Sequence, residues 1–142
     1  MTLNPEIWGP HFWFFLETIA LTYPLHPNDV SKKKYYDFIQ NLPLFIPNPE
    51  IGNKFSKLID TFPVTPYLDS RLSFMKWVNF IHNKINNELD KPEIKLYEGL
   101  DNYYKHYKPK PQEKKSKKEL YYKIIIVVLL LLIIYLYNIN EN

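Results

Sequence analysis

The chain has 142 residues, of which 46% are hydrophobic and 17% aromatic, and its formal net charge is +3. This length accommodates one small domain and an appendage. Because the chain contains no cysteine, disulfide bonds, cysteine-ligated zinc, iron–sulfur clusters and thiol nucleophiles are excluded. The positive charge is concentrated in residues 105–123, where eight lysines accompany two glutamates, so the composition does not indicate a nucleic-acid partner.

Prolines punctuate residues 1–104, and the stretches between them have the apolar spacing of helices. No hairpin signal and no sustained alternation of apolar and polar residues predicts a strand. The sequence therefore predicts an all-α fold, a four-helix bundle with a short fifth helix. Leu89 is expected to end the core stripe of the fourth helix. The expected helices run from Pro5 to about Thr22, from a cap at Ser31 to about Leu42, from Pro49 to Asp60, from Asp69 or Ser70 to Leu89, and from about Tyr97 to His106.

A long apolar segment follows the predicted bundle. Between Leu120 and Ile139 the single charged residue is Lys123, and eleven consecutive aliphatic residues run from Ile124 to Ile134. The alternative interpretation is a buried core helix or a β-prone strand, but a core helix of a small domain has a polar face, which this segment lacks. The segment is therefore predicted to be a single C-terminal transmembrane helix with tyrosines near both ends.

Domain organisation follows from this anchor. We expect a helical domain at residues 1–107, a basic Lys/Pro linker at 108–119, the anchor at 120–139 and a short tail at 140–142. Lysines at positions 114, 115, 117 and 118 precede the span. The positive-inside rule then places the domain in the cytosol, as a single-pass, tail-anchored protein.

Two of the predicted helices carry aromatic and polar residues at defined spacings. The first motif is Trp8-Gly9-x3-Trp13, followed by Leu16, Ala20 and Tyr23-Pro24; the second is Arg71, Phe74 and Trp77, followed by His82-Asn83-x2-Asn86-x2-Leu89-x-Lys91-Pro92. These motifs resemble the two flavin-binding helices of the Erv/ALR sulfhydryl oxidases, and the resemblance covers residues 5–107. The segment YEGLDNYYKHYKPKP is similar to the ending of members from large DNA viruses, which implies a host or virion membrane for the anchor.

The resemblance implies a FAD site between these two helices, in a family that converts dithiols to disulfides and passes the electrons through FAD to oxygen. Tryptophans offer flat faces for a flavin or adenine ring, and histidine and asparagine offer hydrogen bonds. Without the resemblance, we would interpret the same side chains as core tryptophans, a satisfied core histidine and solvent-facing asparagines. The implied cofactor-binding residues are Trp8, Gly9, Trp13, Glu17, Phe45, Trp77, His82, Asn83, Asn86 and Lys91.

The sequence departs from the family at two places. The family has Cys-x-x-Cys after the proline of a turn, and Asn48 and Ile51 occupy those positions here. Neither side chain forms a thiolate or a disulfide, so no catalytic residue is expected to be intact. The family also has a histidine where this chain has Glu17, and a carboxylate there is expected to weaken flavin affinity by repelling phosphate.

Three interpretations remain open. The chain is an inactive member that keeps the fold and FAD, as a scaffold or as the partner of an active oxidase. It is a cysteine-stripped version of an oxidase that acts on thiol proteins. It is a tail-anchored helical adaptor without a cofactor. The resemblance also implies a homodimer through the first two helices, which have a surplus of aromatic residues. No metal site is expected, because the four histidines lie far apart and have no acidic neighbours at metal-ligand spacing.

Overall fold

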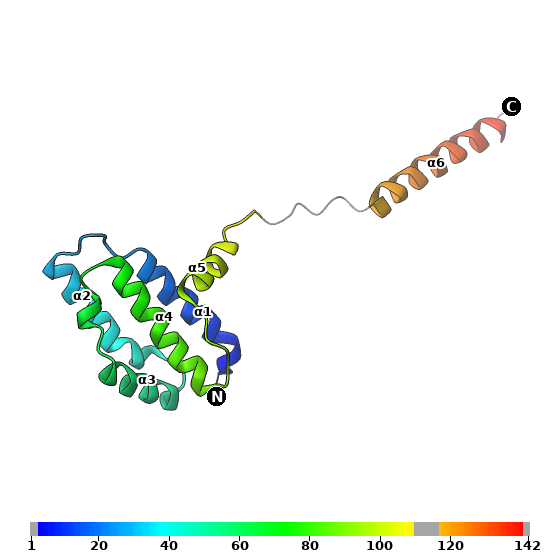
Figure 1. Ribbon diagram of the computed structural model, residues 1–142. Coiled ribbons are helices and arrows are strands. Elements are labelled where there is room, and N and C mark those ends of the chain that lie inside the picture. The colour runs from blue at the N-terminus through cyan, green and yellow to red at the C-terminus, as the bar shows by residue number, and fades with distance from the viewer. Residues whose placement is uncertain (1–2, 110–116, 141–142) are drawn as a thin grey trace. The chain divides into compact units, whose positions relative to one another are not determined.

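The computed structural model describes residues 3–109 and 117–140. Within these ranges the regular elements are helices, with no strand among them, which confirms the predicted all-α fold. The chain divides into two compact units, Met1–Tyr107 and Lys108–Asn142. The first unit holds the helical bundle, and the second holds one long helix (Figure 1).

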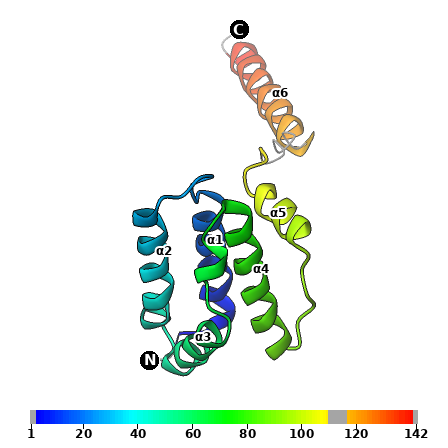
Figure 2. The same cartoon turned by 60° about the vertical axis from the view of Figure 1, so that its left-hand side comes forward.

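The first unit is a four-helix bundle with a short fifth helix. Helices α1 and α4 lie side by side, α5 packs along α4, and the 3₁₀ helix η1 leads from α2 into α3. Figure 2 shows α3 at the end of the bundle where α1 begins. The elements are α1 (Pro5–Leu21), α2 (Asp29–Asn41), η1 (Leu42–Phe45), α3 (Pro49–Thr61), η2 (Thr65–Tyr67), α4 (Arg71–Glu88) and α5 (Leu96–Lys105).

Short polar side chains fix where the bundle helices begin. Asn4 caps α1 by accepting a hydrogen bond from the Glu6 amide at 3.0 Å, and Ser70 caps α4. The predicted cap of the second helix at Ser31 is wrong. Asn28 caps α2 instead, and its Oδ1 accepts from the Ser31 amide at 2.8 Å, because an asparagine three residues earlier reaches the same free N–H groups.

The core lies between the four long helices and is mainly aliphatic and aromatic. Tyr23 of the first motif is fully buried, and its hydroxyl donates to the Leu68 carbonyl at 2.7 Å. Arg71 donates from Nε to the Tyr23 carbonyl. The inward position predicted for Leu89 is wrong, because this side chain is 57% exposed and follows the last turn of α4, where the helix stripe no longer faces the bundle. The buried hydrophobic cluster comprises Leu16, Ala20, Tyr23, Ile39, Leu42, Ile46, Phe55, Ile59, Val64, Leu68, Phe74, Trp77, Val78 and Ile81.

The second unit contains α6 (Lys117–Asn140), which has no charged residue from Ile124 to its end. Its segment Leu120–Asn140, of 21 residues, is long and apolar enough to cross a membrane. At 1.5 Å per residue such a helix spans roughly 31 Å, close to the thickness of a hydrocarbon layer. The predicted membrane orientation depends on lysines at positions 114, 115, 117 and 118, and those side chains lie outside the described part of the structure.

Candidate functional site

The two motif helices run antiparallel and meet along their length. At one end, Tyr23, two residues after the end of α1, contacts Phe74 of α4, with ring centroids 5.1 Å apart. Further along, Trp13 of α1 lies opposite His82 of α4. Trp13 and Tyr23 are ten positions apart and face His82 and Phe74, which are eight apart in reverse order, so the two motifs form one shared surface.

The centre of this surface is a stack of two rings. The Trp13 indole and the His82 imidazole are 4.0 Å apart between centroids, with planes at 9°. Glu17, one turn along α1, places Oε1 3.5 Å from His82 Nδ1, and these side chains are 31% and 17% exposed. Phe55 of α3 lies 6.3 Å from Trp13. Three predicted site residues are therefore in direct contact with one another.

One turn beyond the stack, the polar side chain of Asn86 on α4 lies opposite an open space beside Gly9 on α1. Gly9 precedes Trp13 by four residues, and Asn86 follows His82 by four, so the antiparallel helices place them at the same level. A Cβ added to Gly9 meets no atom within 4 Å. Asn86 is only 6% exposed. Its carboxamide has no hydrogen-bond partner in the described structure, yet neither of its polar atoms is completely sealed.

An unpaired carboxamide in such a position is unusual, because most buried polar side chains have a hydrogen-bond partner. Water or a ligand can reach the two polar atoms of Asn86 through the remaining opening. With the Trp13–His82 stack one turn away, the surface combines aromatic faces and free hydrogen-bonding groups. The outer faces of the two stacked rings and the Asn86 carboxamide fit a flat, hydrogen-bonding group such as the expected flavin.

Asn83 and Lys91 occupy the edge of this region. Asn83 Nδ2 donates to the Ile94 carbonyl at 2.9 Å, and Asn83 Oδ1 accepts from the Ile94 amide at 2.9 Å. Asn79 was not among the predicted site residues, although it lies four residues before Asn83. Its Nδ2 also donates to the Ile94 carbonyl, at 3.1 Å. Lys91 is exposed, and its amide donates to the Asn86 carbonyl at 2.8 Å.

The remaining predicted residues lie elsewhere in the domain. Trp77 is buried in the core, and its Nε1 donates to the Phe62 carbonyl at 2.9 Å. Trp8 lies 6.0 Å from Phe12 in an edge-on arrangement. Phe45, in η1, is 72% exposed. The structure thus brings Trp13, Glu17 and His82 together with Gly9 and Asn86 nearby, while Trp77 contributes to the core and Phe45 to the surface.

The turn before α3 contains the two positions where the family has cysteines. Asn48 is the N-cap of α3, and its Oδ1 accepts from the amides of Glu50 and Ile51 at 2.9 and 3.2 Å. Ile51 is half-buried against the hydrophobic core. Gly52 packs so close to η1 that an added Cβ would lie 2.7 Å from the Pro43 carbonyl oxygen. Both substituted positions therefore have ordinary structural roles in the turn.

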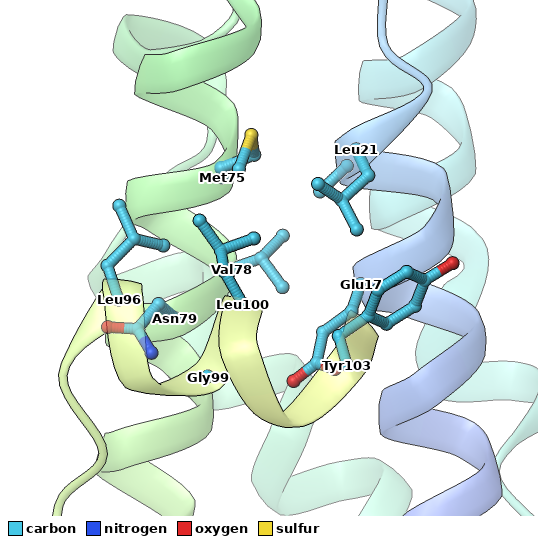
Figure 3. Close-up of a pocket in the computed structure, with 10 residues that line it drawn as sticks. Glu17, Leu21, Met75, Val78, Asn79, Leu96, Gly99, Leu100 and Tyr103 are labelled. Atoms are coloured by element: carbon cyan, nitrogen blue, oxygen red, sulfur yellow. The ribbon is translucent and has the colours of Figure 1, made fainter. Parts of the chain in front are cut away.

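On the other side of the stack, a small cavity lies between α1, α4 and α5 (Figure 3). Its volume of about 30 Å³ is room for one or two water molecules. Glu17, Asn79 and Tyr103 supply its polar lining, and the Tyr103 hydroxyl lies 2.9 Å from Thr18 Oγ1. This cavity is too small for a flavin ring. Among the described residues, no group of three or more metal-ligating side chains is present.

Comparisons with known proteins agree with the motifs. The model of the Erv1 / Alr family matches residues 10–109. The mimivirus protein named "Probable FAD-linked sulfhydryl oxidase R368", from Acanthamoeba polyphaga mimivirus, is 30% identical over 109 residues, which are 76% of each chain. The mitochondrial FAD-linked sulfhydryl oxidase ERV1 of Saccharomyces cerevisiae is 29% identical over 61% of this chain and 44% of its own length.

Solved structures give the same assignment. The crystal structure of the yeast Erv1 core matches with a TM-score of 0.64 and 26% sequence identity, over 75% of this chain and 85% of that one. The FAD-binding domain of Erv1 from Saccharomyces cerevisiae matches with a TM-score of 0.63 over 75% of this chain and 95% of that one. Because the family model covers 10–109 and the fold agrees, the chain belongs to the Erv1 / Alr family.

Proposed function

We propose that this protein is a flavin-binding but catalytically silent member of its family. The observation that carries the proposal is the carboxamide of Asn86, which has no hydrogen-bond partner in the described structure although the residue is only 6% exposed, and which lies one turn from the Trp13–His82 stack. The relatives named above are FAD-linked, and one structural neighbour is a FAD-binding domain. A flavin in this place supplies the partner that Asn86 lacks.

Different residues of the site would contribute stacking, hydrogen bonds and charge to flavin binding. Trp13 and His82 offer ring faces for stacking, and Asn86 offers both a donor and an acceptor. Lys91, at the end of α4, offers an exposed ammonium for a phosphate. Glu17 places a carboxylate beside His82. Its negative charge repels the phosphates of FAD and therefore opposes their binding. Trp8, Phe45, Trp77 and Asn83 remain predictions for this site, with the contacts described above.

The absence of activity follows from the turn before α3. When bound, FAD supplies a two-electron acceptor for a dithiol, and the electrons must come from a thiolate beside it. Asn48 uses its side-chain oxygen to cap α3, and Ile51 packs on the core. The chain has no sulfur other than that of Met1 and Met75, so no residue of this protein accepts electrons from a dithiol substrate.

The experiment compares the full-length chain, purified in detergent, with the variant Asn48→Cys/Ile51→Cys. The proposal predicts a flavin absorption band in both proteins, no dithiothreitol oxidation by the wild type, and oxygen consumption by the double-cysteine variant. Asn48→Ser/Ile51→Ala is the matched control, because serine retains an N-cap and neither residue is a thiol. A colourless, folded wild type supports the adaptor without a cofactor, and dithiothreitol oxidation by the wild type contradicts the silent member.

We also propose that α6 anchors the domain to a membrane with the bundle in the cytosol. The support is an apolar helix, Leu120–Asn140, of which no part is buried, together with the lysines that precede it in the sequence. Protease treatment of intact membranes tests this orientation. Digestion of the bundle from the cytosolic side is the expected result, and protection of the bundle contradicts it.

A dimer through α1 and α2 is the third element of the proposal. Phe15 of α1 and Tyr36 of α2 are exposed, and Phe15 contacts Phe38 of α2 edge-on at 6.4 Å. An exposed aromatic surface of this kind favours association with a second copy or with an active oxidase. Sedimentation of the detergent-solubilised chain tests it: Phe15→Ser is expected to convert a dimer to a monomer, and a monomeric wild type contradicts self-association.

A further inference from the structure

The segment between α4 and α5 is held to α4 by side chains rather than by regular secondary structure. Ile94, in this segment, has both of its backbone groups bound to α4. Asn83 accepts from the Ile94 amide and donates to its carbonyl, each at 2.9 Å. Asn79 donates to the same carbonyl at 3.1 Å. These bonds join residues 11 and 15 positions apart. They therefore hold the segment that follows α4 against the side of that helix.

The other end of the segment is fixed as well. Asp90 has a positive φ of 54°, the left-handed conformation that ends many helices. The Lys91 amide then donates to the Asn86 carbonyl at 2.8 Å. Lys91 therefore lies between two attachments to α4, with only Pro92 and Glu93 separating it from Ile94.

This arrangement separates two roles among neighbouring asparagines. Asn86 has a carboxamide that is free to meet a ligand. The carboxamide of Asn83 is engaged at both its oxygen and its nitrogen by one backbone residue. Direct binding of a ligand by Asn83 would have to compete with this pair of bonds, and losing them would leave the half-buried backbone groups of Ile94 with fewer partners.

We propose that Asn83 is a positioning residue of the flavin site: it holds the segment Lys91–Ile94 on α4 and thereby places the Lys91 ammonium for the phosphates of a flavin dinucleotide. Asn79 assists through the shared carbonyl. This inference rests on the proposed function, because it assigns a role in flavin binding. It differs from the expectation that Asn83 itself contacts the cofactor.

The role requires asparagine in particular. Binding both backbone groups of one residue needs a donor and an acceptor on adjacent atoms. Aspartate keeps the acceptor for the Ile94 amide but loses the donor, and alanine loses both. The two substitutions therefore separate the two bonds, and Asn79 continues to donate to the Ile94 carbonyl in either variant.

The first measurement is hydrogen exchange of the Ile94 amide in the flavin-free, full-length chain. Asn83→Ala is expected to increase the exchange rate by roughly threefold to tenfold, the worth of one net hydrogen bond, whereas Asn83→Asp keeps it near that of the wild type. Asn53→Ala is the matched control, because Asn53 is an exposed asparagine of α3 and belongs neither to α4 nor to the segment. Unchanged Ile94 exchange in Asn83→Ala overturns the inference.

The second measurement compares FAD with riboflavin, which has no phosphate. Asn83→Ala and Lys91→Ala are each expected to weaken FAD binding severalfold and to leave riboflavin binding unchanged, and the double variant is expected to lose no more than Lys91→Ala alone. Equal weakening of both ligands by Asn83→Ala identifies a direct contact and overturns the inference. If the wild type binds neither ligand, the proposed function fails, and the exchange result still shows whether Asn83 holds the segment.

Discussion

Trp13 and His82 stack face to face at 4.0 Å across the two antiparallel helices that carry the family motifs. The two residues are 69 positions apart in the sequence, so only the fold brings them together. Glu17 completes the contact from the side of α1, 3.5 Å from His82. The stack of Trp13 and His82 therefore lies directly beside Glu17, the position where this chain departs from the family.

Replacing Glu17 with glutamine is expected to strengthen FAD binding by roughly threefold to tenfold. The carboxylate repels the phosphates of FAD, and an uncharged amide of the same size removes that repulsion. Riboflavin, which has no phosphate, is expected to change much less. Titration of each flavin into the full-length chain, followed by flavin fluorescence, measures both effects.

The matched control for Glu17 is Asp37→Asn, which removes one negative charge from an exposed position on α2. It tests whether net charge alone affects the affinity. Equal strengthening of FAD binding by both substitutions, or equal strengthening of FAD and riboflavin by Glu17→Gln, contradicts a local repulsion between Glu17 and phosphate.

Asn86→Leu is expected to separate stability from binding. Leucine has the branched shape of asparagine, although its methyl groups are bulkier than the amide atoms, and it removes a carboxamide without a hydrogen-bond partner from a residue that is only 6% exposed. The free energy of unfolding of the flavin-free protein is therefore expected to stay the same or to rise by about 1 kcal/mol. Flavin binding is expected to weaken about tenfold, because the ligand loses its partner. Urea unfolding and flavin titration measure the two quantities.

Asn83→Leu provides the contrast on the same helix. It removes two hydrogen bonds to Ile94 and is expected to lower the free energy of unfolding by about 1–3 kcal/mol. A similar loss of stability in Asn86→Leu would show that the Asn86 carboxamide is already satisfied in the flavin-free protein, which contradicts its assignment to a ligand.

Much of the fold and part of the site can be predicted from the sequence, for identifiable reasons. The helices can be predicted from the spacing of apolar residues and from the positions of prolines, because both are local features of the sequence. The motifs predict that the helices of Trp13 and His82 flank a flavin site, but they do not predict that the two rings stack directly on each other. The roles of Asn83 and Asn86 could not be separated in this way. Both lie near the apolar seam of α4, and which of them is engaged depends on where Ile94 returns along the helix, a long-range feature.

The exact ends of the helices also could not be predicted from the sequence pattern alone. Ser31 and Asn28 are both good capping residues, and the three-dimensional path of the chain after α1 selects Asn28. Leu89 continues the apolar stripe of α4 in sequence, but the chain turns at Asp90 with a positive φ and leaves Leu89 exposed. Periodicity alone does not reveal where a stripe stops facing the core.

Tyr23→Phe is expected to change how stability depends on pH. Burial raises the pKa of the Tyr23 phenol above its ordinary value of about 10. A raised pKa in the folded state means that the stabilisation is complete below about pH 10 and is lost as the pH rises through the folded-state pKa. The variant also loses the hydrogen bond to the Leu68 carbonyl, so its free energy of unfolding at neutral pH is expected to be about 1–2 kcal/mol lower.

Urea unfolding of wild type and Tyr23→Phe between pH 7 and about pH 11 measures this difference. The wild type is expected to lose stability more steeply above pH 10, so that the gap between the two proteins narrows. Tyr97→Phe is the control, because that side chain is 80% exposed. Parallel curves for the wild type and Tyr23→Phe would show that the buried phenol does not contribute to the alkaline loss.

Two glycine-to-alanine substitutions are expected to have opposite effects on stability. An added methyl group at Gly52 would lie 2.7 Å from the Pro43 carbonyl oxygen, so Gly52→Ala must push η1 away from α3 and is expected to lower the free energy of unfolding by about 1–3 kcal/mol. At Gly9, inside α1, the methyl group meets no atom within 4 Å. Gly9→Ala is therefore expected to raise the free energy of unfolding by about 0.5–1 kcal/mol through helix propensity.

The two glycine substitutions are also expected to differ in their effect on flavin affinity. The space beside Gly9 lies at the level of Asn86, and a methyl group there narrows it, so Gly9→Ala is expected to weaken flavin binding while it stabilises the flavin-free bundle. Gly52→Ala acts through the turn that carries Asn48, and its effect on binding should follow its effect on stability. If Gly9→Ala leaves flavin affinity unchanged, the ligand does not occupy the space between Gly9 and Asn86, and the aromatic stack must bind it from another side.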